Sequence, residues 1–176
     1  SNFPVSPFQG GTKEWIDRVF VLVPGATEWI DGGQLPGPRA YGATASTPEG
    51  VWLLGGTDGV ICFDSVLCLR WDDQELSLTT VKGPAGTLPG PSAFNGGAVV
   101  GDAIYMVGGQ ADPNATEAID AVWRLDYKKP DATWETVEAM PGPSRMLPVV
   151  VGRDEGLYVI SGASLFAKDD GTTGRI

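Results

Sequence analysis

The chain has 176 residues, 42% of them hydrophobic, with a formal net charge of −10 and no histidine. This charge argues against a nucleic-acid surface, which needs clustered lysine and arginine. The lack of histidine excludes Ser-His-Asp and Cys-His catalysis and every imidazole metal ligand. No window approaches about eighteen consecutive apolar residues, so we expect no membrane span. The 25 glycines and 14 prolines are spread throughout, which favours many short strands joined by tight turns.

The first part of the chain predicts a loop followed by one pair of strands. Ser1–Thr12 has no regular period, and it has neither the basic start nor the apolar run of a signal peptide. Trp15–Val23 alternates as a strand does, and Thr27–Asp31 is a short partner after the turn at Pro24. No strand pair precedes these two strands in the sequence. We therefore interpret them as the second half of a four-stranded unit.

Two complete four-stranded units and one incomplete unit follow. The predicted strands of the first are Ala40–Ser46, Val51–Leu54, Ser65–Trp71 and Leu76–Val81. Those of the second are Gly96–Val100, Ala103–Val107, Ala121–Tyr127 and Thr133–Val137, with Trp134 in the outer strand. The third unit supplies only Leu147–Val151 and Leu157–Ile160. We predict no further strand around Lys168–Gly171, because this segment is polar and rich in turn-forming residues.

One sequence pattern recurs three times, in Leu35–Gly56, Leu88–Gly109 and Met140–Gly162. Each copy has a Pro-Gly-Pro turn, a short strand, a hairpin, and an apolar strand that ends on a pair of small residues. These pairs begin at Gly55, Gly108 and Ser161, and the spacing is 53 residues both times. A fixed period of about fifty residues that carries several strands is typical of kelch repeats. We therefore predict an all-β fold, a kelch β-propeller of four-stranded antiparallel blades.

The repeats divide the chain into parts of a single propeller. The range 1–34 is the second half of a blade, 35–87 and 88–139 are whole blades, and 140–176 is the first half of a blade. The total is about three blades, whereas a closed ring takes about four to eight. The chain is therefore either half of a six-bladed propeller or a fragment. The missing half would come from a second copy or from the rest of the polypeptide.

Three stretches carry a more specific resemblance, namely SNFPVSPFQGGTKEWIDRVFVL, LPGPRAYGATASTPEGVWLLGGTD and MVGGQADPNATEAIDAVWRLDY. They resemble the kelch-type N-acetylneuraminate (sialic acid) mutarotase family, in particular its cyclically permuted bacterial branch. The Asn-Phe-Pro and Arg-Ala-Tyr-Gly elements are more specific to that family than the diglycines. Its members are six-bladed propellers, which implies that about half of the protein lies outside this chain. The resemblance also implies a bacterial protein that is periplasmic or secreted rather than cytoplasmic.

The activity implied by the resemblance is interconversion of the anomers of sialic acid or a similar acidic sugar. A base takes the proton of the anomeric hydroxyl while an acid protonates the ring oxygen, and no metal or organic cofactor is needed. Relatives carry a glutamate, proposed as the proton acceptor, directly after one diglycine, where this chain has Gln110. Glutamine cannot accept a proton at neutral pH. Either another carboxylate acts, or the protein binds without turnover. The nearest candidate is Asp58, which follows the diglycine of the preceding blade and so has the equivalent placement to Gln110. Asp58 could instead only stabilise the turn before Gly59.

An acidic sugar requires local positive potential, and arginine is the best partner for a carboxylate. Arg39 and Arg145 stand at the start of the innermost strands of their blades, where a funnel around the axis would open. Asn95 belongs to the equivalent segment of the remaining blade, which has no arginine at this position. Asn2 and Phe3 are expected near the same opening of the funnel. We predict these five residues as substrate-binding. The alternative for each arginine is that it pairs with a neighbouring acid or stacks on an aromatic ring.

Four further residues receive structural interpretations. Tyr41 and Phe94 occupy matched positions in the repeat, which favours packing between blades. Cys62 and Cys68 match no metal spacing, and Cys68 falls in an apolar strand, which favours a buried free thiol over a disulfide.

Two functional classes remain open from the sequence. One is a sugar mutarotase, or a sugar-binding relative without the base. The other is a kelch interaction module whose loops bind another protein, because fold does not determine function. The first should expose a polar funnel, and the second an apolar or aromatic loop patch.

Overall fold

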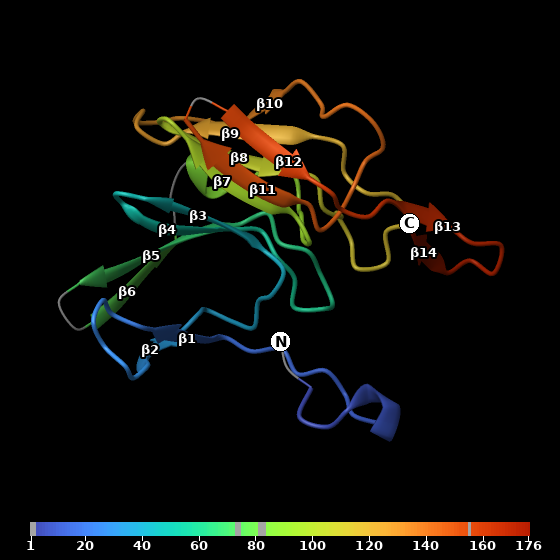
Figure 1. Ribbon diagram of the computed structural model, residues 1–176, viewed down its shortest axis with the longest axis horizontal. Coiled ribbons are helices and arrows are strands. Elements are labelled where there is room, and N and C mark those ends of the chain that lie inside the picture. The colour runs from blue at the N-terminus through green and yellow to red at the C-terminus, as the bar shows by residue number, and fades with distance from the viewer. Residues whose placement is uncertain (1–2, 73–74, 81–83, 155) are drawn as a thin grey trace.

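The computed structural model describes residues 3–72, 75–80, 84–154 and 156–176. Within these ranges the chain is all-β, with antiparallel strand pairs and two one-turn 3₁₀ helices, η1 (Pro7–Gln9) and η2 (Pro84–Gly86) (Figure 1). The loop predicted for the N-terminal residues is confirmed from residue 3 onward, with η1 inside it. Among the described residues, no helix has the length and apolar character that a membrane span requires.

Two four-stranded sheets form the centre of the molecule, and we call them the first and second blades. The first contains β3 (Ala43–Thr47), β4 (Gly50–Leu54), β5 (Val66–Asp72) and β6 (Glu75–Thr80), in that order. The second contains β7 (Gly96–Val100), β8 (Ala103–Val107), β9 (Val122–Asp126) and β10 (Glu135–Val137), also in chain order. All eight predicted strands are present, and Val81, the expected end of the fourth, lies outside the described residues. The largest boundary difference is at β3, which begins three residues later than expected.

Three two-stranded sheets flank these blades. They are β1 (Arg18–Val21) with β2 (Ile30–Gln34), β11 (Val149–Arg153) with β12 (Gly156–Ile160), and β13 (Leu165–Ala167) with β14 (Thr173–Arg175). The first pair corresponds to the two strands predicted for this part of the chain, although β2 lies later than expected and β1 contains a register shift between Arg18 and Phe20. We call the second pair, β11 and β12, the third blade.

The hairpin of β13 and β14 contradicts the prediction that no strand follows Ile160. Its turn is closed locally, because Asp170 Oδ1 accepts the backbone N–H of Thr172 at 2.9 Å and its hydroxyl at 2.6 Å. Gly171 supplies the left-handed backbone that this turn requires, with φ +78°. The polar turn residues were recognised in the sequence, but the short strands on either side lack a clear alternating pattern.

The blades pack through their first strands. β3 lies beside β7, and β7 lies beside β11, which makes these three the inner strands (Figure 1). A Cβ added at Gly97 would lie 2.9 Å from the Cβ of Ala43, and one added at Gly96 would lie 2.3 Å from Val150 Cγ2. Glycine is therefore required where the backbones of neighbouring blades approach. The arrangement is that of a β-propeller whose ring is not closed within the described residues.

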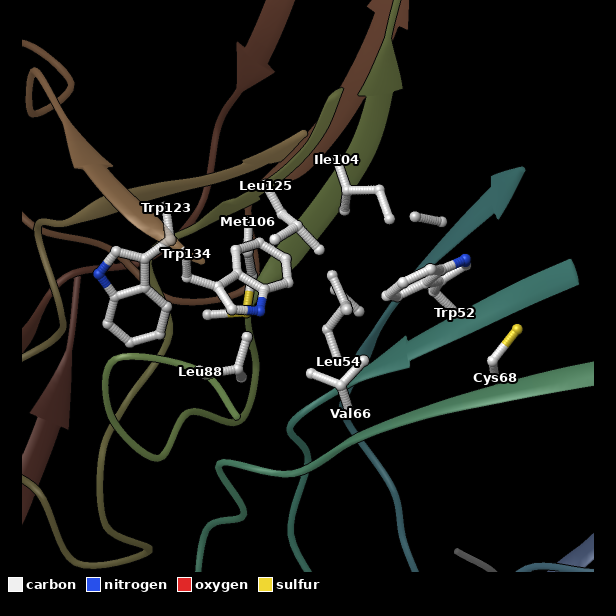
Figure 2. Close-up of a cluster of buried hydrophobic side chains, with 12 residues drawn as sticks. Trp52, Leu54, Val66, Cys68, Leu88, Ile104, Met106, Trp123, Leu125 and Trp134 are labelled. Atoms are coloured by element: carbon white, nitrogen blue, oxygen red, sulfur yellow. The ribbon is translucent and has the colours of Figure 1, made fainter. Parts of the chain in front are cut away.

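The hydrophobic core lies between the first and second blades (Figure 2). Leu54 and Val66 come from the first blade, whereas Ile104 and Leu125 come from the second, and all four are fully buried. Trp134 directly precedes β10 rather than lying within it, and its Nε1 donates to the carbonyl oxygen of Ala85 at 3.0 Å. The core thus joins the two blades into one folding unit.

Candidate functional site

Each blade has an equivalent bridge at one end of its sheet, where the chain enters the inner strand. The bridges are Ala40 with Thr57, Ala93 with Gln110, and Met146 with Ala163. Corresponding residues are again 53 positions apart. We call this end of the three blades the mouth, because the inner strands begin here and the predicted site residues were placed here.

Backbone hydrogen bonds connect the blades at the mouth. The N–H of Phe94 donates to the carbonyl oxygen of Tyr41 at 2.7 Å, and that of Leu147 donates to Phe94 at 2.6 Å. All three residues have left-handed backbones, with φ of 59°, 55° and 55°. A left-handed residue other than glycine costs energy, so its recurrence once per repeat indicates a common structural requirement.

The diglycines add a second set of links between blades. Gly56 N–H donates to the carbonyl oxygen of Ser92 at 2.8 Å, and Gly109 N–H donates to that of Arg145 at 3.0 Å. The preceding glycines, Gly55 and Gly108, have φ of 61° and 63°. Their structural role is therefore the close approach of adjacent blades.

The predicted substrate ligands Arg39 and Arg145 lie at the mouth and make an equivalent hydrogen bond. Arg39 Nη1 donates to Gly55 O at 3.3 Å, and Arg145 Nη1 donates to Ser161 O at 3.3 Å. Ser92 occupies the same position of the second blade, and its Oγ lies 3.1 Å from Gly108 O. The shared partner is the carbonyl of the first residue of the small-residue pair. Each of these side chains thus supports its own blade.

Arg39 has further partners that hold its guanidinium in place. Nη1 also donates to Ser65 O at 3.2 Å and Nη2 to Ser65 Oγ at 2.7 Å, while the guanidinium stacks 4.3 Å from the centre of the Phe63 ring. Burial lowers the pKa of Arg39, and the charge of Asp64 partly opposes this effect. The stacking alternative considered from the sequence is therefore observed for Arg39.

Asn95 is turned toward the junction of the first two blades. Its Nδ2 donates to Ser92 O at 3.2 Å and to Ser92 Oγ at 3.1 Å. Its Oδ1 is buried and has no hydrogen-bond partner among the described atoms. Phe3 is 47% exposed, and Asn2 lies outside the described residues. The structure therefore brings Arg39, Asn95 and Arg145 to the mouth.

Gln110 is 3% exposed and lies against the second blade. Its Nε2 donates to the carbonyl oxygen of Asp112 at 2.8 Å. It contributes to the wall of a cavity of about 440 Å³ that lies between the loop around Ala115 and the hairpin of β13 and β14. Lys168 and Arg175 line the same cavity. Gln110 can offer hydrogen bonds there, but its amide cannot take a proton at neutral pH.

Asp58 is not the structural equivalent of Gln110, contrary to the placement inferred from the sequence. Thr57 is the equivalent residue, because it forms the corresponding bridge in the first blade. Asp58 Oδ1 accepts the N–H groups of Val60 and Ile61 at 2.8 and 2.9 Å, as a turn-stabilising aspartate does. These backbone hydrogen bonds lower the pKa of Asp58, so its carboxylate is ionised at neutral pH but is a weaker base than usual.

A cluster at the mouth that the sequence interpretation missed consists of Lys13, Trp15, Tyr41 and Phe94, and we call it the Lys13 platform. Lys13 Nζ donates to the Tyr41 hydroxyl at 2.7 Å and lies 4.0 Å and 4.2 Å from the centres of the Trp15 and Tyr41 rings. Trp15 meets Tyr41 edge-on at 6.0 Å, and Tyr41 stacks on Phe94 at 4.3 Å. The sequence signal for this cluster was a lysine two residues before a tryptophan. It was overlooked because Trp15 was interpreted as the first residue of a strand.

The Lys13 platform joins the N-terminal segment to the first two blades. Trp15 packs against Gly59, since a Cβ added there would lie 2.4 Å from the indole ring. The platform is therefore next to the Asp58 turn. Among the described residues, Lys13 forms no salt bridge within 4.0 Å. Its ammonium thus has aromatic rings and a hydroxyl around it, but no carboxylate of the described residues within salt-bridge distance.

Cys62 and Cys68 are both buried, and neither is part of a disulfide. Burial raises the pKa of Cys62 to about 11, and the charges of Asp112 and Asp58 contribute to the increase, while a hydrogen bond with Thr57 opposes it. The thiolate is thus disfavoured at neutral pH, which makes Cys62 a poor nucleophile.

The fold and the mouth define the class of this protein, an open part of a β-propeller built from a 53-residue repeat. No family model matches the chain. The chain is 29% identical to leucine-zipper-like transcriptional regulator 1 of Mus musculus and Homo sapiens over 148 residues. This match covers 78% of the chain and 17% of the relative. The chain is also 35% identical to N-acetylneuraminate epimerase of Yersinia pestis (strain Pestoides F) over 71 residues. This second match covers 40% of the chain and 18% of the relative.

These similarities fit a kelch-type propeller. The matches span less than a fifth of the length of these curated relatives.

Proposed function

We propose that the mouth binds an acidic monosaccharide, N-acetylneuraminate or a close analogue, and interconverts its anomers. The observation that carries the proposal is the Lys13 platform. The clustered aromatic rings of the platform, of which Tyr41 is 38% exposed, provide an apolar surface against which a sugar ring can pack. The ammonium of Lys13 supplies the positive charge that a sugar carboxylate requires. The similarity to an N-acetylneuraminate epimerase supports the choice of sugar.

Anomer interconversion also requires a base beside the bound sugar. Asp58 is the carboxylate that we assign to this step, because its turn adjoins Trp15 through Gly59. Oδ1 is held by two backbone N–H groups, and Oδ2 forms no described hydrogen bond. In the proposed reaction Oδ2 takes the anomeric hydroxyl proton while an acid protonates the ring oxygen. The sugar ring then opens, and the two transfers are reversed when it closes.

Substitution Lys13→Met is expected to weaken the binding of N-acetylneuraminate by about tenfold, because it removes the ammonium and keeps a side chain of similar length. Isothermal titration calorimetry with the purified sugar measures the effect. The matched control is Arg18→Met, since Arg18 is an exposed cation already paired with Asp31 at 2.7 Å. Equal affinities for wild type and Lys13→Met would refute the assignment of the platform.

Substitution Asp58→Asn is expected to slow catalysed anomer exchange by about a hundredfold or more while leaving sugar affinity within a few fold. NMR of freshly dissolved N-acetylneuraminate measures the approach to anomeric equilibrium. The wild-type rate should fall as the pH drops through the lowered pKa of Asp58, because only the ionised carboxylate can take a proton. No acceleration by stoichiometric wild-type protein would reject the enzymatic part of the proposal.

A second candidate function is binding of another protein without catalysis. Two observations favour it, namely the longer match to a transcriptional regulator and the exposed side chains of Val60 and Ile61 in a loop of the first blade. The two candidates differ in their response to sugar. A sugar-binding mouth gives a saturable calorimetric signal that depends on Lys13, whereas an interaction module gives none.

A further inference from the structure

The cavity of about 440 Å³ beside Gln110 lies between the loop that follows β8 and the hairpin of β13 and β14. Its volume is in the range of small-molecule sites. Thr173 Oγ1 donates to the carbonyl oxygen of Ala115 at 3.3 Å, which joins the two walls. Two backbone hydrogen bonds between Ser164 and Ile176, at 2.8 and 3.0 Å, fix the base of the hairpin. The cavity is therefore bounded by backbone that is held in place.

The charge of the cavity wall is opposite to that of the chain. Among the described residues that line the cavity, the two charged ones are the cations Lys168 and Arg175. Neither of them forms a salt bridge within 4.0 Å in the described part of the chain. The chain as a whole has a formal net charge of −10. A local group of positive charges in an acidic protein directs anions to this place.

The carboxylates that are close in sequence to this wall act in their own turns. Asp112 Oδ1 accepts the backbone N–H of Asn114 at 2.8 Å. Asp170 Oδ1 accepts the backbone N–H and the hydroxyl of Thr172, as described above. Neither carboxylate belongs to the lining of the cavity. The two positive charges of the wall are therefore available to a ligand.

Gln110 adds a fixed polar group to the same wall. Its side chain is 3% exposed, and two backbone hydrogen bonds with Ala93 at 2.8 and 3.0 Å hold its main chain. One hydrogen of Nε2 is donated to the carbonyl oxygen of Asp112 at 2.8 Å. An amide has a second N–H and a carbonyl oxygen, and neither makes a described hydrogen bond here. Gln110 can thus donate to an anion that lies between the two cations.

The remaining wall is largely apolar. Pro113, Leu165 and Phe166 belong to it. The ring of Phe166 lies against Gly174, where an added Cβ would overlap the ring. The position of the ring thus depends on glycine at this site. Such a wall suits the carbon skeleton of a small organic anion.

We propose that this cavity binds a small organic phosphate monoester, with the phosphate between Lys168 and Arg175. A phosphate monoester carries close to two negative charges at neutral pH, which matches two cations, whereas a carboxylate would leave one cation without a partner. The guanidinium of Arg175 donates two parallel hydrogen bonds to phosphate oxygens, and Gln110 Nε2 donates a third. The organic part packs against Phe166. This site is separate from the Lys13 platform, and the argument does not depend on the proposed sugar-binding function.

The first test is calorimetric titration of the protein with phenyl phosphate at about pH 7.5 and low salt, where the probe is a dianion. Phenyl sulfate, a monoanion of the same shape, should bind at least about tenfold more weakly. Arg175→Met and Lys168→Met should each weaken the binding of phenyl phosphate by about tenfold or more. Equal binding of the two probes would overturn the charge match, and wild-type affinity in both variants would overturn the site.

The matched control is Arg153→Met, which removes the same charge from an exposed side chain of the third blade. It should change the affinity for phenyl phosphate by less than about twofold, because a distant exposed charge is screened. A loss as large as that of Arg175→Met would show that only the overall charge of the protein matters, which contradicts a built site.

The second test separates this cavity from the mouth. An excess of N-acetylneuraminate should not displace phenyl phosphate, and Lys13→Met should leave the affinity for phenyl phosphate unchanged. Displacement by the sugar together with a dependence on Lys13 would place the phosphate at the mouth and overturn the proposal. If the protein binds phenyl phosphate but no sugar, the proposed function fails and the phosphate site stands.

Discussion

Substitution Gly108→Ala is expected to lower the free energy of unfolding by about 3 kcal/mol or more, which is a large fraction of the stability of a typical domain. Two effects act at this position. Gly108 has φ +63°, where a Cβ is disfavoured by about 1–2 kcal/mol. The added Cβ would also lie 2.3 Å from the carbonyl oxygen of Arg145, which belongs to the next blade. Chemical denaturation followed by tryptophan fluorescence measures the change.

Gly101 provides the control that separates the two effects. It has a similar φ of +56°, but a Cβ added there meets nothing within 4 Å. Gly101→Ala should therefore cost only the conformational part, about 1 kcal/mol. A loss at Gly108 no larger than that at Gly101 would show that the close contact between blades does not contribute.

Substitution Leu54→Ala is expected to destabilise the protein by about 3 kcal/mol, within the range known for buried leucines. Leu54 is fully buried in the core between the first and second blades (Figure 2). Blade packing limits the collapse of the resulting cavity, because the inner strands are already in contact. Urea denaturation should show a lower midpoint with an unchanged slope.

The same strand supplies the control for this second prediction. Val51 lies on β4 with Leu54, but its side chain is 42% exposed. Val51→Ala should therefore change the stability by no more than about 0.5 kcal/mol. Similar losses for the two variants would mean that the core between the blades is not what stabilises the described chain.

Much of the fold could be predicted because its signals are local. The strands Gly96–Val100 and Ala103–Val107 were predicted with their observed bounds, since a tight turn at Gly101 lies between two short apolar runs. The hairpin of β13 and β14 was missed because its strands are three residues long and lack alternation. Whether such short segments form strands depends on the turn that joins them and on the segments they contact.

The site was less accessible from sequence. The sequence placed Arg39 and Arg145 at the start of the inner strands, but their hydrogen bonds to backbone carbonyls depend on how the chain returns to those strands. Asp58 was matched to Gln110 by proximity to a diglycine, whereas the backbone bridge pairs Thr57 with that position. Whether these residues take part in binding or catalysis is still a prediction.

The sequence by itself determined the repeat, its 53-residue period and the glycines on which blade packing depends, because these follow from local backbone requirements. Only the tertiary structure decided which side chains meet. Lys13 and Tyr41 are 28 positions apart, and Tyr41 and Phe94 are 53 apart, yet they form one cluster because adjacent blades bring equivalent ends of their sheets together. Likewise, the apolar pattern of β11 and β12 was visible in the sequence. The exposure of its apolar side chains, such as Val149 and Tyr158, could not be predicted, because burial depends on whether another blade lies against the sheet.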